Sequence, residues 1–171
     1  MDFFELAKSR YSVRSYKDMP IEEEKLQKIL EAGRFAPTAR NYQPQRIYVA
    51  KSEEARKKLA SVCRCTWGAP VILVVCYDRE RNCKRLLTPG KESGEMDASI
   101  VCTHMMLQAW DLGIGSCWVG YYNDDEMAKV LGLPDHIRVA ALLPIGYPAD
   151  DAAPLDMHFK SRELSDMVEE I

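Results

Sequence analysis

The sequence predicts a single domain of the α+β or mixed α/β class, covering residues 1–171. Two observations carry this prediction. Helical segments separate short apolar strands that are mostly not neighbours along the chain. In addition, residues 95–112 contain no Pro or Gly and are then stopped by Gly113 and Gly115, which indicates one long helix. A chain of 171 residues suits one domain that buries a substantial core.

The composition is that of an ordinary globular protein, with 47% hydrophobic and 29% charged residues. A net charge of −3 gives no reason to expect nucleic acid or an acidic membrane as a partner, and the three tryptophans are too scattered for a base-stacking platform. The first ten residues lack the apolar core of a signal peptide, and no apolar run reaches membrane-spanning length. We therefore expect a cytoplasmic protein that binds neither nucleic acid nor membrane.

The N-terminal third is predicted to contain three helices and one strand. Apolar side chains between residues 3 and 7 are expected to form the buried face of a short helix that ends near Ser9. A second helix is predicted over residues 22–34, a strand over 46–50 and a third helix over 53–62. The middle of the chain is predicted to contain a central strand at 71–76, a charged surface excursion at 78–90 and then the long helix. After the long helix we predict a helix at 124–131 and a strand at 139–143. The chain is then expected to end in an extended tail at 150–157 and a last helix from Lys160 to about Glu170.

The long helix is apolar over most of its circumference. Asp97, His104, Gln108 and Asp111 fall within one narrow stripe at about 100° per residue, and apolar residues cover nearly everything else. Such a helix is normally buried in a core or in a subunit interface. We therefore expect it to be the central strut that holds the loop at 116–120 in place.

The segment at residues 10–16 alternates as an extended strand does. Period two puts Arg10, Ser12 and Arg14 on one side, with Tyr11 and Val13 on the other. Two guanidinium groups beside a hydroxyl suit a phosphate, because Arg offers paired donors to its oxygens. A solvated sheet edge would show the same pattern, so this segment alone leaves both interpretations open.

Residues 36–45 form a polar segment that begins and ends near prolines. It is either a connecting loop before the next strand or a binding loop, since its Asn and Gln amides can both donate and accept toward a planar heterocycle.

Several kinds of catalytic site are absent from the sequence. It has no GxSxG, P-loop or HExxH motif, and the glycines after the long helix follow a helix, so they are not a dinucleotide fingerprint. The three histidines are far apart, and Cys63-x-Cys65 lacks a second pair at zinc-site spacing, so we predict no metal. The six cysteines are interpreted as small buried hydrophobic residues. Any chemistry is therefore expected to come from a cofactor.

Five blocks in this order resemble the FMN-dependent nitroreductase family. They are Arg10-Tyr11-Ser12-Val13-Arg14, residues 36–44 (APTARNYQP), residues 112–120 (LGIGSCWVG), residues 144–148 (PIGYP) and Lys160-Ser161-Arg162. Each block is weak alone, but five in order are specific, and the match runs from Phe4 to the predicted last helix. The resemblance implies an α+β fold with a mixed, mostly antiparallel central sheet flanked by helices, a long buried central helix, and a homodimer that binds FMN at the subunit interface.

By the same resemblance, the chain supplies a set of cofactor-binding residues. They are Arg10, Tyr11, Ser12, Arg14, Pro37, Thr38, Ala39, Asn41, Gln43, Cys117, Trp118, Val119, Gly120, Pro144, Ile145, Gly146, Lys160 and Arg162. Arg10, Lys160 and Arg162 would hold the FMN phosphate and Ser12 the ribityl chain. Arg14 would lie near the ribityl chain or the flavin N1–O2 edge, where a cation favours the anionic reduced flavin.

The remaining roles implied by the resemblance involve three loops. Residues 37–39 would come from the opposite subunit, and Asn41 and Gln43 would fix the flavin or their own loop. The backbone N–H of Val119 or Gly120 would face flavin N5 and O4, and residues 144–146 would pack along the cofactor. Arg40 and Tyr42 are the residues expected to border the acceptor pocket.

The implied activity is ping-pong transfer of hydride from NAD(P)H through flavin N5 to a nitroaromatic, quinone or similar acceptor, with proximity over the flavin in place of a dedicated acid or base. The alternatives are another flavin reaction on the same scaffold, such as dehalogenation or flavin fragmentation, and a non-catalytic flavin-binding protein.

The sequence departs from the family pattern at two places. Gln45 follows Pro44 where Trp is frequent, and Tyr11 stands in place of a frequent second Arg. The second departure makes phosphate binding depend more on Arg10 and residues 160–162.

Overall fold

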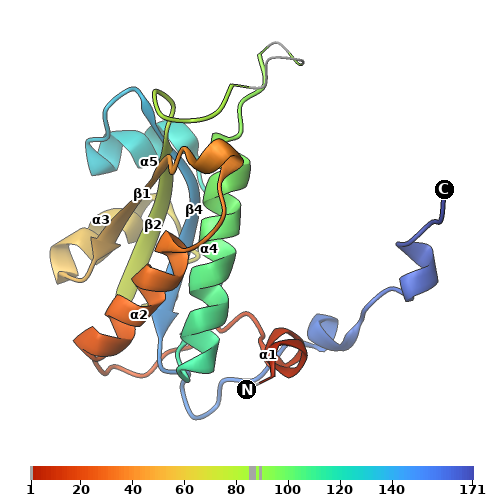
Figure 1. Ribbon diagram of the computed structural model, residues 1–171. Coiled ribbons are helices and arrows are strands. Elements are labelled where there is room, and N and C mark those ends of the chain that lie inside the picture. The colour runs from red at the N-terminus through yellow and green to blue at the C-terminus, as the bar shows by residue number, and fades with distance from the viewer. Residues whose placement is uncertain (1, 85–87, 89) are drawn as a thin grey trace.

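The computed structural model describes residues 2–84, 88 and 90–171, and in that part of the chain a four-stranded sheet forms the centre of the molecule (Figure 1). The strand order is β1-β2-β4-β3, and all three pairings are antiparallel. The strands are β1 (Gln45–Ala50), β2 (Val71–Asp78), β3 (Gly115–Ser116) and β4 (Ile137–Gly146). The predicted α+β class with a mostly antiparallel sheet is confirmed.

Helices cover both faces of this sheet. The helices of the described chain are α1 (Phe3–Ser9), α2 (Glu23–Arg34), α3 (Glu53–Val62), α4 (Gly94–Asp111) and α5 (Asp124–Leu131), with short 3-10 turns η1 (Ala39–Asn41), η2 (Asp156–Phe159) and η3 (Leu164–Asp166). Figure 1 shows α2 and α4 on one face, and α3 and α5 on the other. The predicted helices at 53–62 and 124–131 are confirmed at both ends.

The central strand β2 is buried on both faces because each face has its own core. Leu73 and Val75 join the core under α2 and α4, whereas Ile72 and Val74 join the core under α3 and α5. Alternate side chains of a strand point to opposite faces, so a strand between two helical layers is apolar at every position. This is why the run at residues 71–76 predicted a central strand.

Helix α4 is the longest helix of the described chain, and its role as a central strut is confirmed. Its 18 residues extend over about 27 Å at 1.5 Å per residue. The polar stripe is not uniform in exposure: Asp97 is 3% exposed, whereas His104 and Asp111 on the same stripe are exposed. Asp97 is buried because the loop after α2 covers the first turns of α4.

Two terminal predictions are wrong. The first helix forms at residues 3–9 but buries none of its residues, and Phe3 is 69% exposed. The predicted last helix from Lys160 to Glu170 is replaced by the single turn η3 within an exposed segment. A short helix needs tertiary packing to be stable, and this segment has exposed side chains throughout.

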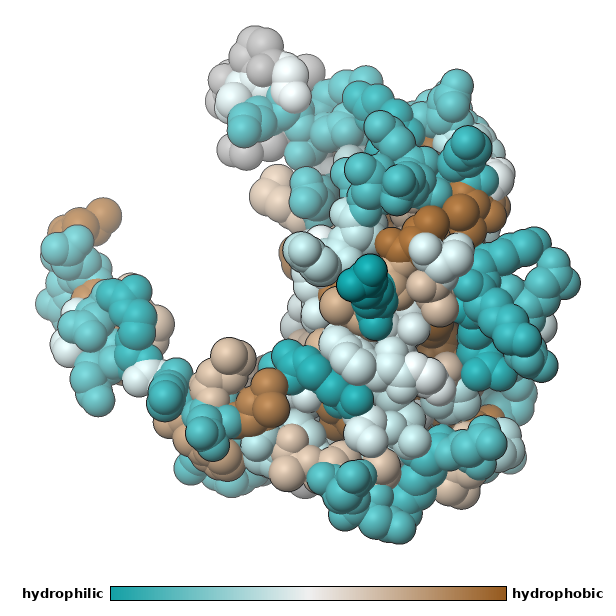
Figure 2. Space-filling view, turned by 180° about the vertical axis from the view of Figure 1, so that it is seen from behind, coloured by the Kyte–Doolittle hydropathy of each residue, from teal (hydrophilic) through white to brown (hydrophobic). Residues whose placement is uncertain are grey.

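The C-terminal segment leaves the body of the molecule as an arm (Figures 1 and 2). Figure 2 shows the arm separated from the body by a wide hollow. Apolar side chains stay exposed along it, at Leu155, Met157, Phe159, Leu164, Met167 and Val168. Among the described residues, no helix combines the length and hydropathy that crossing a bilayer would need.

Candidate functional site

The segment at residues 10–14 is attached to β3, at the end of the sheet that α4 reaches with its C-terminus. Ser12 forms an isolated parallel bridge with Ser116, and the Val13 N–H donates to the Ser116 carbonyl at 2.9 Å. A Cβ on Gly115 would come within 2.7 Å of the Val13 side chain. Glycine at 115 therefore allows the two segments to approach this closely.

The side chains of Arg10, Ser12 and Arg14 gather as the alternation predicted. Arg10 Nη1 donates to Ser12 Oγ at 3.4 Å, and Arg14 Nη1 donates to the Ser12 carbonyl at 3.2 Å. Arg14 also lies over the Trp67 ring, 5.7 Å from its centroid. Burial lowers the pKa of the Arg10 guanidinium, because a partly desolvated cation is less stable in its charged form. A bound anion would offset that cost.

Ser116 and Cys117 form the floor beside these cations. Ser116 is fully buried, and its Oγ has no hydrogen-bond partner among the described residues. Burial raises the pKa of the Cys117 thiol, while Arg14, Ser12 and Arg10 act in the opposite direction. A buried hydroxyl without a partner, next to two guanidinium groups, fits a ligand with phosphate and hydroxyl groups. FMN has both.

In the loop that follows, one of the two candidate backbone donors, Val119 or Gly120, is already paired. The Val119 N–H donates to the Leu142 carbonyl at 2.9 Å, and Leu142 N–H returns a bond of 2.9 Å to Val119. Val119 is therefore held to β4, which leaves the exposed Gly120 as the residue whose N–H can face a ligand. A Cβ on Gly120 would come within 2.8 Å of the Trp118 ring, so this close packing needs glycine.

Residues 144–146 lie directly beneath this loop at the end of β4. The Cys117 N–H donates to the Pro144 carbonyl at 3.3 Å, and Ser116 pairs with Ile145 across the sheet. Ile145 is fully buried in the core, so its side chain supports the floor of the site from below. A Cβ on Gly146 would meet the Pro70 ring at 2.7 Å.

The start of the C-terminal arm passes beside Arg10 and Tyr11. Tyr11 Oη donates to the Ala152 carbonyl at 3.2 Å, and the Tyr11 ring contacts His158 edge-on. Arg10 and Ser161 line the same open hollow of about 770 Å³. Lys160 and Arg162 have exposed side chains, and Arg162 Nη2 donates to the Asp166 carbonyl at 2.5 Å. Ser161 of the arm thus lines the same hollow as Arg10. The side chains of Lys160 and Arg162, which were predicted to bind the phosphate, are exposed to solvent.

The loop at residues 37–43 is anchored to the other end of α4. The Ala39 N–H donates to Asp97 Oδ1 at 2.9 Å, and Ser93 Oγ donates to Asp97 Oδ2 at 2.7 Å. Sequence reasoning gave Asp97 no role, since it was grouped only with the polar stripe of the long helix. The sequence did contain a signal for Asp97: it is an acidic residue in the first turn of a helix, where the helix dipole favours a negative charge.

Three residues of this loop adopt backbone angles that L-residues rarely take. Arg40, Asn41 and Gln43 have φ of 53°, 57° and 51°. Gln43 N–H donates to Thr38 Oγ1 at 3.1 Å, and Gln43 Nε2 donates to Asn41 Oδ1 at 2.9 Å. Strained backbone persists only where its surroundings hold it, and here Asp97 and Thr38 do so. The side chains of Arg40, Asn41, Tyr42 and Gln43 are exposed.

The predicted site residues therefore form two groups within one chain. Residues 10–14, 116–120 and 144–146 gather at the C-terminal end of α4, whereas residues 37–43 lie at its N-terminal end. The two groups are separated by the helix length of about 27 Å.

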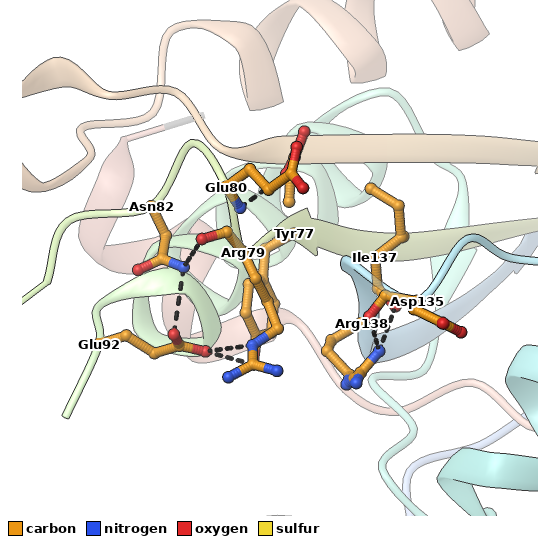
Figure 3. A network of polar contacts seen from close by, with 9 residues as sticks. Tyr77, Arg79, Glu80, Asn82, Glu92, Asp135, Ile137 and Arg138 are labelled. Atoms are coloured by element: carbon orange, nitrogen blue, oxygen red, sulfur yellow. Dashed lines mark hydrogen bonds and ion pairs between the residues drawn. The ribbon is translucent and has the colours of Figure 1, made fainter. Parts of the chain in front are cut away.

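The far end of the sheet carries a polar network of another kind (Figure 3). Arg79 Nε lies 3.2 Å from Glu92 Oε1, and Asn82 Nδ2 donates to Glu92 Oε2 at 3.3 Å. Nearby, ligand atoms of Asp78, Glu80 and His136 lie within 4.8 Å of one another, an arrangement that the sequence did not predict. Asp78 already accepts from the Glu80 N–H at 2.9 Å and lies 3.6 Å from Arg46 Nη2.

Comparison with known proteins identifies the family of this chain. The model of the nitroreductase family matches residues 7–67 and 64–147. The chain belongs to the nitroreductase family. A nitroreductase family protein from Clostridium difficile has a solved structure that superposes with a TM-score of 0.92 at 40% identity, covering 99% of this chain and 98% of that one. The prediction of the family is confirmed.

Two further relatives bear on the cofactor. The FMN reductase [NAD(P)H] of Bacillus subtilis is 33% identical over 159 residues, which is 83% of this chain and 64% of that protein. A structure from Desulfovibrio desulfuricans, described as a nitroreductase in complex with FMN, has a TM-score of 0.82 at 27% identity and covers 100% of this chain and 97% of that one. The predicted class of FMN-using, NAD(P)H-dependent oxidoreductases is confirmed at the level of these relatives.

Proposed function

We propose that this protein is an FMN-dependent oxidoreductase that takes hydride from NAD(P)H and delivers it to a nitroaromatic, quinone or similar planar acceptor. One observation carries the proposal: Arg10, Ser12 and Arg14 converge on a floor with a buried unpaired hydroxyl, next to a loop with one available backbone donor. When bound, the flavin would supply the redox chemistry, accepting and releasing two electrons at N5.

The chain's own groups would bind and orient the cofactor. Arg10 would hold the phosphate and Ser12 the ribityl chain, while the Gly120 N–H would donate to the N5–O4 edge. Arg14 would place positive charge near the ribityl chain or the N1–O2 edge, which stabilises negative charge that develops there. Stacking of both substrates in turn over the same face would give a ping-pong order without a separate acid or base.

We further propose that the site is complete only in a homodimer. Thr38, Asn41 and Gln43 would come from the second subunit, since the length of α4 separates them from Arg10 within one chain. Exposed apolar side chains on α4, such as Met96 and Ile100, would pack in the subunit interface, as would Phe3 of α1.

The arm is suited to the same interface. Leu164, Met167, Val168 and Ile171 follow the i, i+3, i+4, i+7 spacing of one helical face, and all are exposed. Packing of this face on a second subunit would bury these four side chains. It would also change the position of Lys160 and Arg162, which lie in the same arm. Their exposed positions on either side of Ser161 are consistent with that arrangement.

Two alternatives use the same scaffold. Dehalogenation or flavin fragmentation would need additional lid or acid residues. In the described chain, the space beside Gly120 and Tyr121 is an open hollow. A non-catalytic flavin-binding protein would bind FMN but would not turn over.

Spectroscopy of the purified protein separates these functions. We expect yellow protein that binds FMN, is bleached by NADH or NADPH without oxygen, and recovers its colour when a quinone is added. Protein that takes up no FMN contradicts the cofactor assignment. Flavin that binds but is bleached by neither nucleotide would leave the non-catalytic alternative, and bleached flavin that reduces no quinone or nitroaromatic would leave another flavin reaction.

A further inference from the structure

An open hollow lies beside Gly120, whose backbone N–H is the donor proposed for the flavin. The hollow has a volume of about 470 Å³ and is lined by residues 62–64, where α3 ends, and by residues 120–123, in the loop before α5. Sites for small molecules have volumes of about 300–1,000 Å³. A hollow of this size can therefore hold one ring-sized substrate next to the proposed donor.

The two segments that line this hollow are fixed by the fold. Cys63 Sγ lies 3.5 Å from the Tyr121 carbonyl, to which its thiol donates. Asn123 Oδ1 caps α5 by accepting from the Glu126 N–H at 3.0 Å, and α3 and α5 lie on the same face of the sheet (Figure 1). The end of α3 therefore forms one side of the hollow and the loop before α5 forms the other.

Arg64 is the one residue with a charge at neutral pH among the described residues that line the hollow. Burial raises the pKa of the Cys63 thiol and of the Tyr122 phenol, so both side chains stay neutral. The nearby carboxylates of Asp124 and Asp125 belong to the lining of a different hollow. The lining of this hollow thus carries a single positive charge and no negative one.

The Arg64 guanidinium has no hydrogen bond or ion pair with any described residue. Arg34, Arg46 and Arg79, by contrast, each face a carboxylate. The paired donors of an arginine match the two oxygens of a carboxylate, so Arg64 can bind an acid group without breaking an internal contact. In the loop that lines the hollow, the Tyr121 side chain is 84% exposed and offers an aromatic face to a planar ring.

We propose that Arg64 determines acceptor specificity, by selecting planar acceptors that carry an acidic group such as a ring carboxylate. The proposal rests on the proposed function, since it concerns the acceptor that is reduced at the flavin. The acid group would pair with Arg64, and the ring would lie against Tyr121, beside Gly120. The phosphates of NAD(P)H are a second source of negative charge at the same flavin, and the two half-reactions distinguish these sources.

The test compares two nitro compounds that share a ring but differ in charge. 4-Nitrobenzoate carries a carboxylate, and methyl 4-nitrobenzoate is its neutral ester. In both, the nitro group takes up two electrons from the reduced flavin together with two protons and becomes a nitroso group and water, while NADH supplies the electrons for the next turnover. In a ping-pong order, kcat/KM for the acceptor reports the half-reaction with the acceptor, and kcat/KM for NADH reports the other half-reaction.

Arg64→Gln should lower kcat/KM for 4-nitrobenzoate by about five-fold relative to the ester, as expected for one solvent-exposed charge pair. Arg64→Lys keeps the charge and should keep most of this preference. Arg64→Glu should favour a cationic acceptor, (4-nitrobenzyl)trimethylammonium, over the carboxylate. Arg81→Gln removes an exposed arginine from the loop after β2, so it is the matched control and should behave as wild type. The flavin absorbance of each variant checks that the fold and the FMN site are intact.

The outcomes separate this inference from the proposed function. A wild-type ratio of the two acceptors in Arg64→Gln, with FMN bound and both compounds reduced, would overturn the role of Arg64 alone. A loss confined to kcat/KM for NADH or NADPH would assign Arg64 to the nucleotide phosphates and would also overturn the acceptor assignment. Protein that binds no FMN, or that reduces neither compound, would refute the proposed function and this inference with it.

Discussion

The two ends of the sheet both gather charged side chains, but they use them differently. At the end where β2 finishes at Asp78, cations face carboxylates: Arg79 lies 3.2 Å from Glu92 (Figure 3). Arg46 lies 3.6 Å from Asp78. At the other end, Arg10 and Arg14 approach a hydroxyl, a carbonyl and a thiol. The first end is a structural network, whereas at the second we propose a bound anion, since no carboxylate among the described residues pairs with Arg10 or Arg14.

The largest expected effect concerns the support of the distal loop. Asp97→Ala removes the acceptor of the Ala39 N–H and the Ser93 hydroxyl, and each donor left unpaired costs about 1–3 kcal/mol. We expect unfolding free energy to fall by about 2–4 kcal/mol. FMN binding should weaken as well, because Asn41 and Gln43 lose their fixed positions. Chemical denaturation and flavin titration measure the two effects, and an unchanged flavin affinity would separate the loop from the site.

Removing the half-buried cation should weaken the cofactor without unfolding the protein. Arg10→Ala loses one charge-assisted contact, which is about 1.5–3 kcal/mol. This corresponds to about 10- to 150-fold in the dissociation constant of FMN. Fluorescence titration of the apoprotein measures it. An affinity within two-fold of wild type, roughly the error of such titrations, would remove the phosphate assignment.

A smaller effect is expected from the arm. The Arg162 guanidinium is exposed, so Arg162→Ala should weaken FMN by about 0.5–1.5 kcal/mol after solvent screening is allowed for. The loss should fall as salt rises, since exposed charges are screened. A salt-independent loss would indicate that the residue acts by ordering the arm, through its bond to the Asp166 carbonyl.

The smallest effect on FMN binding is expected at the opposite end of the sheet, at the ion pair of Arg79 with Glu92. Arg79→Ala breaks a partly exposed ion pair with Glu92, which costs about 0–1 kcal/mol of stability. FMN affinity should stay at the wild-type value, as measured by the same titration. A clear loss of FMN affinity in this variant would mean that the two ends of the sheet are coupled.

The sequence predicted the elements whose signals are local. Ser52 and Asn123 cap α3 and α5 through their side chains, and Gly132 ends α5 with a φ of 64°, so both helices matched the prediction. The strand at 139–143 was predicted too short, because β4 continues through Pro144 to Gly146. Its pairing with β3 is a long-range contact that periodicity does not show.

The site was predicted in part for the same reason. The alternation at residues 10–14 correctly placed both arginines beside Ser12, since it depends only on strand geometry. The burial of Asp97 and the bond that occupies the Val119 N–H depend on segments far away in the chain. The predicted terminal helix is wrong because its apolar side chains stay exposed, and a short helix without tertiary packing is unstable.

Each FMN site is proposed to be shared between two subunits, and complementation between variants tests this sharing most directly. One variant carries Arg10→Ala and the other carries Asn41→Ala together with Gln43→Ala. Each should bind FMN poorly alone. After the two are unfolded, mixed in equal amounts and refolded, half of the dimers are heterodimers with one intact site.

We expect the mixture to recover about a quarter of the wild-type FMN sites, with wild-type affinity. If both groups of residues served the same site within one chain, every site would keep one defect. A mixture that binds no more FMN than its two components would contradict the shared site.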